Sequence, residues 1–175
     1  MSKLLKTIKN AKLELLKFKN HPINILLDDD KIEYFKGLSL VENIKDSKKA
    51  LEYFKILLLS ADLDKNTDFS KKNEFSEKEF TKIMEIISKN SLALTFLLDF
   101  TILALKKDEN LKINDKNMLK TFIKFLKINE SELENIEKLA KFFIQNDKNQ
   151  VLEFIDKNYK SADKIFDYLI EYYGD

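Results

Sequence analysis

Residues 50–128 repeat one pattern twice, and this repeat favours a helical fold. In each copy an apolar run enters a polar loop, and a second apolar run leaves it. Apolar residues recur within the runs at spacings of three and four residues, which is typical of amphipathic helices. The successive segments are 50–61, 62–79 and 80–89 in the first copy, then 91–105, 106–117 and a run to 128 in the second.

The rest of the chain also favours helices. Its 175 residues include only 2 Gly and 1 Pro, too few for the turns of an all-β protein. The length suits one domain with a single large core. We therefore predict an all-α, single-domain bundle of about seven to nine helices. Its parts are N-terminal helices in 1–49, the repeated helix–acidic loop–helix core in 50–128 and C-terminal helices in 129–175.

Serines mark where several helices are expected to begin. In a capping box, a serine and a glutamate three residues later each bond to the other's backbone N–H. Ser91 stands just before the second long apolar run and is expected to cap its helix. Two capping boxes can be recognised by their spacing, Ser76 with Glu79 and Ser131 with Glu134.

The first helix is strongly basic. Residues 2–20 hold six lysines and one glutamate, a net charge of +5. A basic amphipathic helix can lie on an anionic membrane or dock onto a partner. Packing in the core with a solvated lysine face explains the same pattern and is favoured. Residues 129–175 have 11 carboxylates and 6 lysines, so the two ends of the chain are expected to dock on each other.

The sequence shows no membrane or export signal. No apolar run reaches the roughly 18 residues needed to span a bilayer. Residues 1–20 lack the apolar block and the small-residue cleavage site of a signal peptide. A cytoplasmic location is expected.

Several function classes are disfavoured by what the chain lacks. It has no Cys, which excludes thiol nucleophiles and thiolate metal sites. A Ser-His-Asp triad would need the one histidine, His21, whose place beside Pro22 favours a role at a helix end. All 31 basic residues are lysines and the net charge is +1, which argues against specific nucleic-acid binding. We predict a non-enzymatic protein whose partner is another protein.

One carboxylate interrupts the second long apolar run. Asp99 lies among leucines and phenylalanines. If it is buried there, it needs a partner. A lysine on a neighbouring helix is the expected partner.

The acidic loop 62–79 resembles a degenerate EF-hand. Calcium takes six to eight oxygen ligands from alternate loop positions and a closing carboxylate on the following helix. Lys72 occupies a ligand position and Asn73 replaces the turn glycine, and any well-capped polar loop has a similar composition. The hypothesis is a site for Ca²⁺ or another divalent cation, with ligands from Asp68, Ser70, the backbone carbonyl of Glu74, Ser76 and Glu79.

Short stretches at the helix junctions of residues 50–135 point to a family. They are Ser60-Ala61-Asp62, 75–79, 105–108 with 113–117, and 125–133. These stretches resemble the acidic helix junctions of the TerB-like tellurite-resistance family, without that family's two glycines. The resemblance implies a non-enzymatic helical module in stress response, phage defence or envelope-linked complexes. It also implies a divalent-cation site at Asp62, Glu79 and Asp108.

Three functions remain open from the sequence. The first is a TerB-like interaction module whose acidic loop binds a cation or a partner. The second is a calcium-responsive, EF-hand-like protein. The third is a structural or immunity-type partner protein that acts through its surface.

Overall fold

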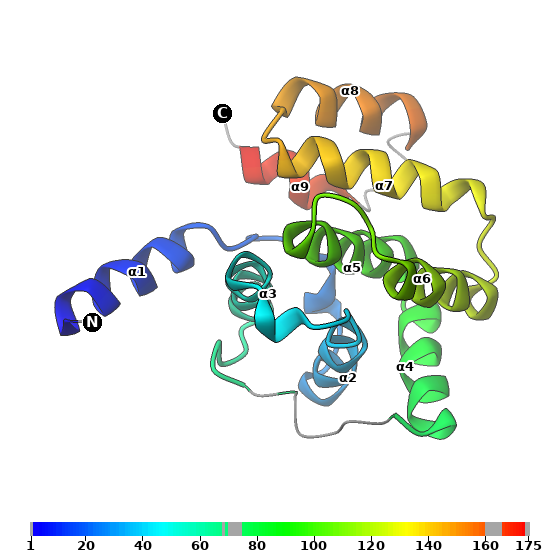
Figure 1. Cartoon of the computed structure of the whole chain (residues 1–175), viewed down its shortest axis with the longest axis horizontal. Helices are drawn as coiled ribbons and strands as arrows, with labels where there is room; N and C mark the ends of the chain where they lie inside the picture. The colour runs from blue at the N-terminus through cyan, green and yellow to red at the C-terminus, as the bar shows by residue number, and fades with distance from the viewer. Residues whose placement is uncertain (1, 68, 70–74, 160–165, 174–175) are drawn as a thin grey trace.

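The chain is helical throughout the part that the structure describes. The structure is a computed structural model, and it describes residues 2–67, 69, 75–159 and 166–173. Every regular element in these ranges is a helix, which confirms the all-α prediction (Figure 1). In chain order the elements are α1 (Lys3–Leu15), the short 3₁₀ helix η1 (Pro22–Ile25), α2 (Asp28–Leu38), the 3₁₀ helix η2 (Ile44–Asp46), α3 (Lys48–Ser60), α4 (Glu77–Lys89), α5 (Ala93–Lys107), α6 (Ile113–Leu126), α7 (Ser131–Ile144), α8 (Lys148–Asn158) and α9 (Asp167–Tyr173).

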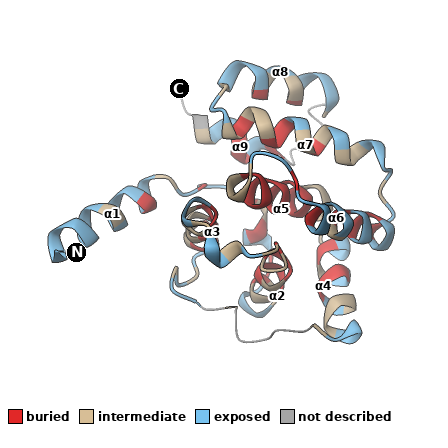
Figure 2. Cartoon of the chain, viewed as in Figure 1, coloured by how far each residue is buried: buried red, intermediate tan, exposed pale blue. Residues whose placement is uncertain are grey.

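Helix α5 is the centre of the fold. Its sequence is apolar nearly all round, and every residue from Thr95 to Leu105 is buried. Helices α2, α3, α4, α6 and α7 pack around it (Figure 2). The second long apolar run of the sequence is therefore the core helix.

Aromatic rings fill the space between α5 and α6, and α2 approaches them closely. The Phe122 ring meets the rings of Phe96 and Phe100 edge-on, with centroids 5.0 Å apart in both pairs. Gly37 allows the approach of α2, because a Cβ there would lie 2.9 Å from Cε2 of Phe96 and 3.0 Å from Cγ2 of Ile83. A side chain at this position would push α2 away from α4 and α5.

Of the three predicted serine caps, one is confirmed and two are wrong. Ser76 Oγ accepts from the Glu79 N–H at 3.2 Å, and Glu79 Oε2 accepts from the Ser76 N–H at 3.1 Å, so a capping box opens α4. Ser131 is itself the first residue of α7, and its N–H donates to the side chain of Asn129. Ser91 has a φ of 56° and belongs to the turn that ends α4.

One left-handed turn ends four helices without glycine. After α3, α4, α6 and α7, a residue with φ between 54° and 56° is followed by an N–H that donates to the carbonyl five residues earlier. This arrangement satisfies the last carbonyls of a helix, and glycine usually supplies it. The four left-handed residues are Asp62, Ser91, Lys127 and Asn146.

Helix α1 does not pack as a core helix, so that prediction is wrong. It extends away from the body beside α3, and Leu13 is its only buried residue (Figures 1 and 2). The two ends of the chain do meet, but through the segment that follows α1. Phe18 packs against Tyr168, and Asn20 donates to Glu171. None of the helices in the described ranges is long and apolar enough to cross a bilayer.

Candidate functional site

Three of the seven residues of the predicted cation site lie outside the described part of the chain. They are Asp68, Ser70 and Glu74. Among the residues that are described, no group of three or more His, Asp or Glu side chains could hold a metal ion. The site for Ca²⁺ or another divalent cation therefore stays a prediction from the sequence.

The four members of the predicted site that the structure describes, Asp62, Ser76, Glu79 and Asp108, lie at helix ends. Asp62 is the left-handed residue that ends α3. Glu79 closes the capping box with Ser76 at the start of α4. Asp108 follows α5, and its Oδ1 lies 3.9 Å from Nζ of Lys112. The capping box explains Glu79, and the tolerance of aspartate for a positive φ explains Asp62.

A buried hydrogen-bonded cluster joins the N-terminal segment to α2 and α5. Nε2 of His21 lies 2.9 Å from Oδ2 of Asp99, and the Tyr34 hydroxyl donates to the same oxygen at 2.7 Å. Nδ1 of His21 accepts from the Ile23 N–H, so the ring proton lies on Nε2 and is donated to Asp99. His21 therefore caps η1, which confirms its predicted role, whereas the predicted lysine partner of Asp99 is wrong.

This cluster has a structural role. Asp99 is 0% exposed and His21 is 3% exposed, so a solute cannot reach either side chain in the folded chain. A histidine and a carboxylate perform acid–base catalysis only within reach of a substrate proton. The cluster instead holds the segment after α1 against the core helix.

Two buried tyrosines beside Asp99 are expected to make the stability of the fold decrease at alkaline pH. Burial raises the pKa of Tyr34 well above its usual value, and the charge of Asp99 and the hydrogen bond to it raise it further. Burial and then the charge of Asp99 also raise the pKa of Tyr168. The folded state therefore keeps both protons above about pH 10, where the unfolded chain releases them. This contribution to stability is complete below that pH and is lost as the pH rises further.

We expect the free energy of unfolding to fall between about pH 10 and pH 11.5. Urea denaturation followed by circular dichroism measures it. The control combines Tyr34→Phe with Tyr168→Phe, because this variant lacks both titrating hydroxyls and keeps every lysine. Its stability should fall less steeply over the same range, and an equally steep fall would contradict the role of the two tyrosines.

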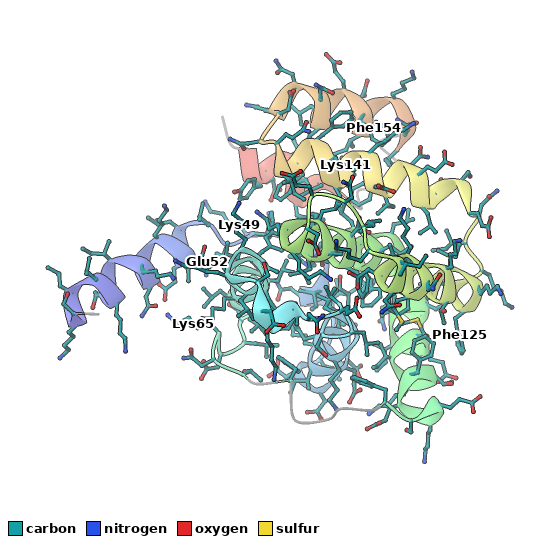
Figure 3. All side chains as sticks on the ribbon, viewed as in Figure 1. Lys49, Glu52, Lys65, Phe125, Lys141 and Phe154 are labelled. Atoms are coloured by element: carbon teal, nitrogen blue, oxygen red, sulfur yellow. The ribbon has the colours of Figure 1, made fainter. Side chains whose placement is uncertain are left out.

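Lysines from three helices gather around one glutamate where α1, α3 and α5 meet. Nζ of Lys9 lies 3.0 Å from Oε1 of Glu52, and this hydrogen bond is the main cause of a lowered pKa at Glu52. The charges of further lysines lower that pKa as well, so these side chains lie within electrostatic range of one carboxylate. Figure 3 labels Lys49 and Glu52 in this region. We refer to the five lysines as the lysine junction: Lys9, Lys12, Lys48, Lys49 and Lys106.

Lys106 is a partly buried member of the lysine junction. Its Nζ lies 5.5 Å from the ring centroid of Tyr53, within the range of cation–π attraction. Burial lowers the pKa of Lys106, and the charge of Lys49 lowers it further, while Glu52 acts in the opposite direction. Lys49 and Lys106 therefore repel each other, and Glu52 offsets this repulsion only in part.

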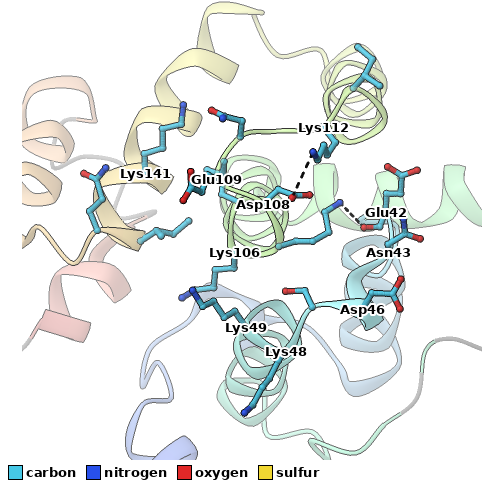
Figure 4. A pocket seen from close by; sticks show the side chains of 17 residues that line it. Glu42, Asn43, Asp46, Lys48, Lys49, Lys106, Asp108, Glu109, Lys112 and Lys141 are labelled. Atoms are coloured by element: carbon cyan, nitrogen blue, oxygen red, sulfur yellow. Dashed lines mark hydrogen bonds and ion pairs between the residues drawn. The ribbon is translucent and has the colours of Figure 1, made fainter.

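The lysine junction borders a surface groove of about 1400 Å³ (Figure 4). Lys49 and Lys106 lie side by side at one end of the groove. Along the rest of it the cations are paired, since Lys107 lies 2.7 Å from Asp115 and Lys112 lies near Asp108. The carboxylates of Glu42, Asp46 and Glu109 also line the groove. Apolar and amide side chains complete the lining, among them Leu105, Asn110, Ile113, Ile144 and Gln145.

The sequence reasoning missed the lysine junction. The 31 lysines are spread along the whole chain, so no local pattern distinguishes these five. Only the packing of α1 and α5 against α3 brings them together. The net charge of +5 in residues 2–20 was a partial indication, because Lys9 and Lys12 belong to that segment.

Comparisons with protein-family models, with curated proteins and with solved structures found no match. The TerB-like resemblance of residues 50–135 therefore stays a prediction. We infer function from the geometry and charge of the residues themselves.

Proposed function

We propose that the chain is a non-enzymatic helical module that binds a carboxylate-rich segment of another protein at the lysine junction. The charge of the junction is the main support. Four lysines interact electrostatically with Glu52 and a fifth, Lys49, with Lys106, which gives the junction a net charge of +4 on a chain whose net charge is +1. A concentrated charge of one sign attracts and orients a partner of the opposite sign.

Lys49 and Lys106 are the proposed point of contact. A carboxylate placed between their ammonium groups would relieve the repulsion between them and accept charge-assisted hydrogen bonds. The partial burial of Lys106 would strengthen this attraction, because charges interact more strongly away from water. The adjoining groove gives room for the rest of the segment. Amides, lysines and the carboxylates of Glu42, Asp46 and Glu109 line it, so the acidic residues of the segment are expected at Lys49 and Lys106.

Two further observations support binding as the function. The chain has no arginine, so its cations are lysines, which bind an anion as single point charges instead of through a planar fork. The buried His21–Asp99 pair is inaccessible to a substrate. A protein-binding module agrees with the TerB-like resemblance and also with an immunity-type partner protein.

Charge reversal at the lysine junction tests this function. We expect a glutamate-rich peptide to bind the wild-type chain. A variant with Lys49→Glu and Lys106→Glu should bind the peptide at least about tenfold more weakly. Isothermal titration calorimetry measures both affinities, and circular dichroism confirms that the variant is folded.

The matched control places the same charge change on another helix. Lys116→Glu with Lys120→Glu alters two exposed lysines of α6 that lie outside the lysine junction. This variant should bind the peptide nearly as well as the wild type. Equal weakening in the control would mean that the peptide is attracted to lysines in general, which would contradict a specific site. A wild-type chain that does not bind the peptide would contradict it too.

A further inference from the structure

The face of α1 that points away from the body is apolar and uncovered. Leu4, Ile8 and Leu15 are 68%, 56% and 86% exposed. Together with Ala11, which is also exposed, they follow one another at spacings of four, three and four residues. These spacings place them in one stripe along the helix. Exposed apolar side chains gathered in this way mark an interaction surface.

The opposite face of α1 contacts the body of the protein. Leu13 is buried, and its position two residues before Leu15 places the two side chains on different sides of the helix. Lys9 pairs with Glu52 of α3. The helix therefore contacts its own chain at Lys9 and Leu13 and leaves the apolar stripe exposed.

Helix α1 is capped at its start and anchored to the body after its end. At its start, Ser2 Oγ accepts from the Leu5 N–H at 3.3 Å and caps the helix. After its end, the Phe18 N–H donates to Ser60 Oγ at 2.7 Å, and the Phe18 side chain is buried. Binding through the apolar stripe therefore avoids the cost of ordering a disordered segment.

We propose that α1 lies in the surface of an anionic lipid bilayer, with its apolar stripe at the boundary between headgroups and acyl chains. The +5 charge of residues 2–20 complements anionic headgroups. Lys3 and Lys12 adjoin the stripe in sequence, and their long stems let the ammonium groups reach headgroups beside it. The 13 residues of α1 are too few to span a bilayer and suit a helix that lies in its plane.

A lipid surface fits the apolar stripe better than a protein does. Protein interfaces concentrate their binding energy in Trp, Tyr and Arg anchors, whereas the stripe has only leucine, isoleucine and alanine. A symmetric contact with α1 of a second copy would bring two strongly basic helices together, and their charges would repel. Lys12 beside the stripe also belongs to the lysine junction, but the stripe itself contains no residue of the junction. Substitutions in the stripe therefore leave all five lysines in place and test the lipid contact separately from an acidic partner.

Vesicle co-sedimentation with the full chain tests the lipid contact. One set of vesicles contains phosphatidylcholine alone, and the other contains equal parts of phosphatidylcholine and phosphatidylglycerol. We expect the wild type to sediment with the anionic vesicles and to stay in solution with the neutral ones. A variant with Leu4→Ser, Ile8→Ser and Leu15→Ser should bind the anionic vesicles about a hundredfold more weakly, since it loses the apolar area of the stripe.

The control removes three exposed apolar side chains outside α1. Ile25→Ser, Leu27→Ser and Ile113→Ser together should leave binding to the anionic vesicles unchanged. The lipid contact is contradicted if the wild type does not bind anionic vesicles, if it binds neutral ones equally, or if the control loses as much binding as the stripe variant. A dimer in sedimentation equilibrium that dissociates in the stripe variant would also contradict it, and would assign the stripe to a second copy.

Discussion

The variant Asp99→Ala is expected to lose about 3–5 kcal/mol of unfolding free energy. Oδ2 of Asp99 accepts hydrogen bonds from both His21 and Tyr34, and all three side chains are buried. Truncation leaves two buried donors without an acceptor, at about 1–3 kcal/mol each, and also opens a cavity beside α5. Urea denaturation should show a lower midpoint with an unchanged slope.

Tyr34→Phe is the matched comparison for Asp99→Ala. It removes one of the two hydrogen bonds and keeps the aromatic ring in the core. We expect it to cost about 1 kcal/mol, the usual net value of one hydrogen bond. If Asp99→Ala destabilises the chain no more than Tyr34→Phe does, the carboxylate is not the centre of the cluster. The burial of Phe18 would then be what holds the N-terminal segment in place.

Asp115→Ala is expected to destabilise the chain by a similar amount, about 3–5 kcal/mol, because it breaks a buried ion pair. Asp115 is 1% exposed, and its Oδ2 lies 2.7 Å from Nζ of Lys107. Its Oδ1 accepts from the Glu42 N–H at 2.9 Å. Without Asp115 the nearly buried ammonium of Lys107 keeps only the Glu42 carbonyl, at 2.6 Å, which leaves its charge unbalanced.

A double variant shows whether this loss of stability comes from the unpaired charge of Lys107. Lys107→Met with Asp115→Leu replaces both partners by apolar side chains of similar size and is expected to cost less than Asp115→Ala alone. Because Asp115 accepts from the Glu42 N–H and Lys107 donates to the Glu42 carbonyl, hydrogen exchange in residues 39–47 should increase in Asp115→Ala. A double variant as unstable as Asp115→Ala would attribute the loss to packing instead of charge.

The helices could be predicted because their sequence signals are local. The apolar run 91–105 located the core helix, and the spacing of Ser76 and Glu79 located the start of α4. The roles of Ser91 and Ser131 could not be predicted in the same way. With only 2 Gly in the chain, helices end on left-handed residues of other types, so a serine between two helices can belong to an end or to a start.

The candidate surfaces could not be predicted because they depend on which face of each helix meets the body. The sequence of α1 has the pattern of an amphipathic helix, and this pattern does not show whether the apolar side is buried or exposed. In the structure only Leu13 packs inward, while Leu4 and Leu15 stay exposed. The pairing of His21 with Asp99 joins residues 78 positions apart, and the lysine junction joins three helices, so no local pattern in the sequence indicates either of them.

The function proposed for this chain depends on where an acidic partner binds. Carbodiimide crosslinking joins a carboxylate directly to a lysine in contact with it, and mass spectrometry then locates the crosslinked lysine. With a glutamate-rich peptide and the full chain, we expect most crosslinks at Lys49 and Lys106. Crosslinks spread over the exposed lysines of the whole chain, or concentrated outside the lysine junction, would contradict its role as the binding site.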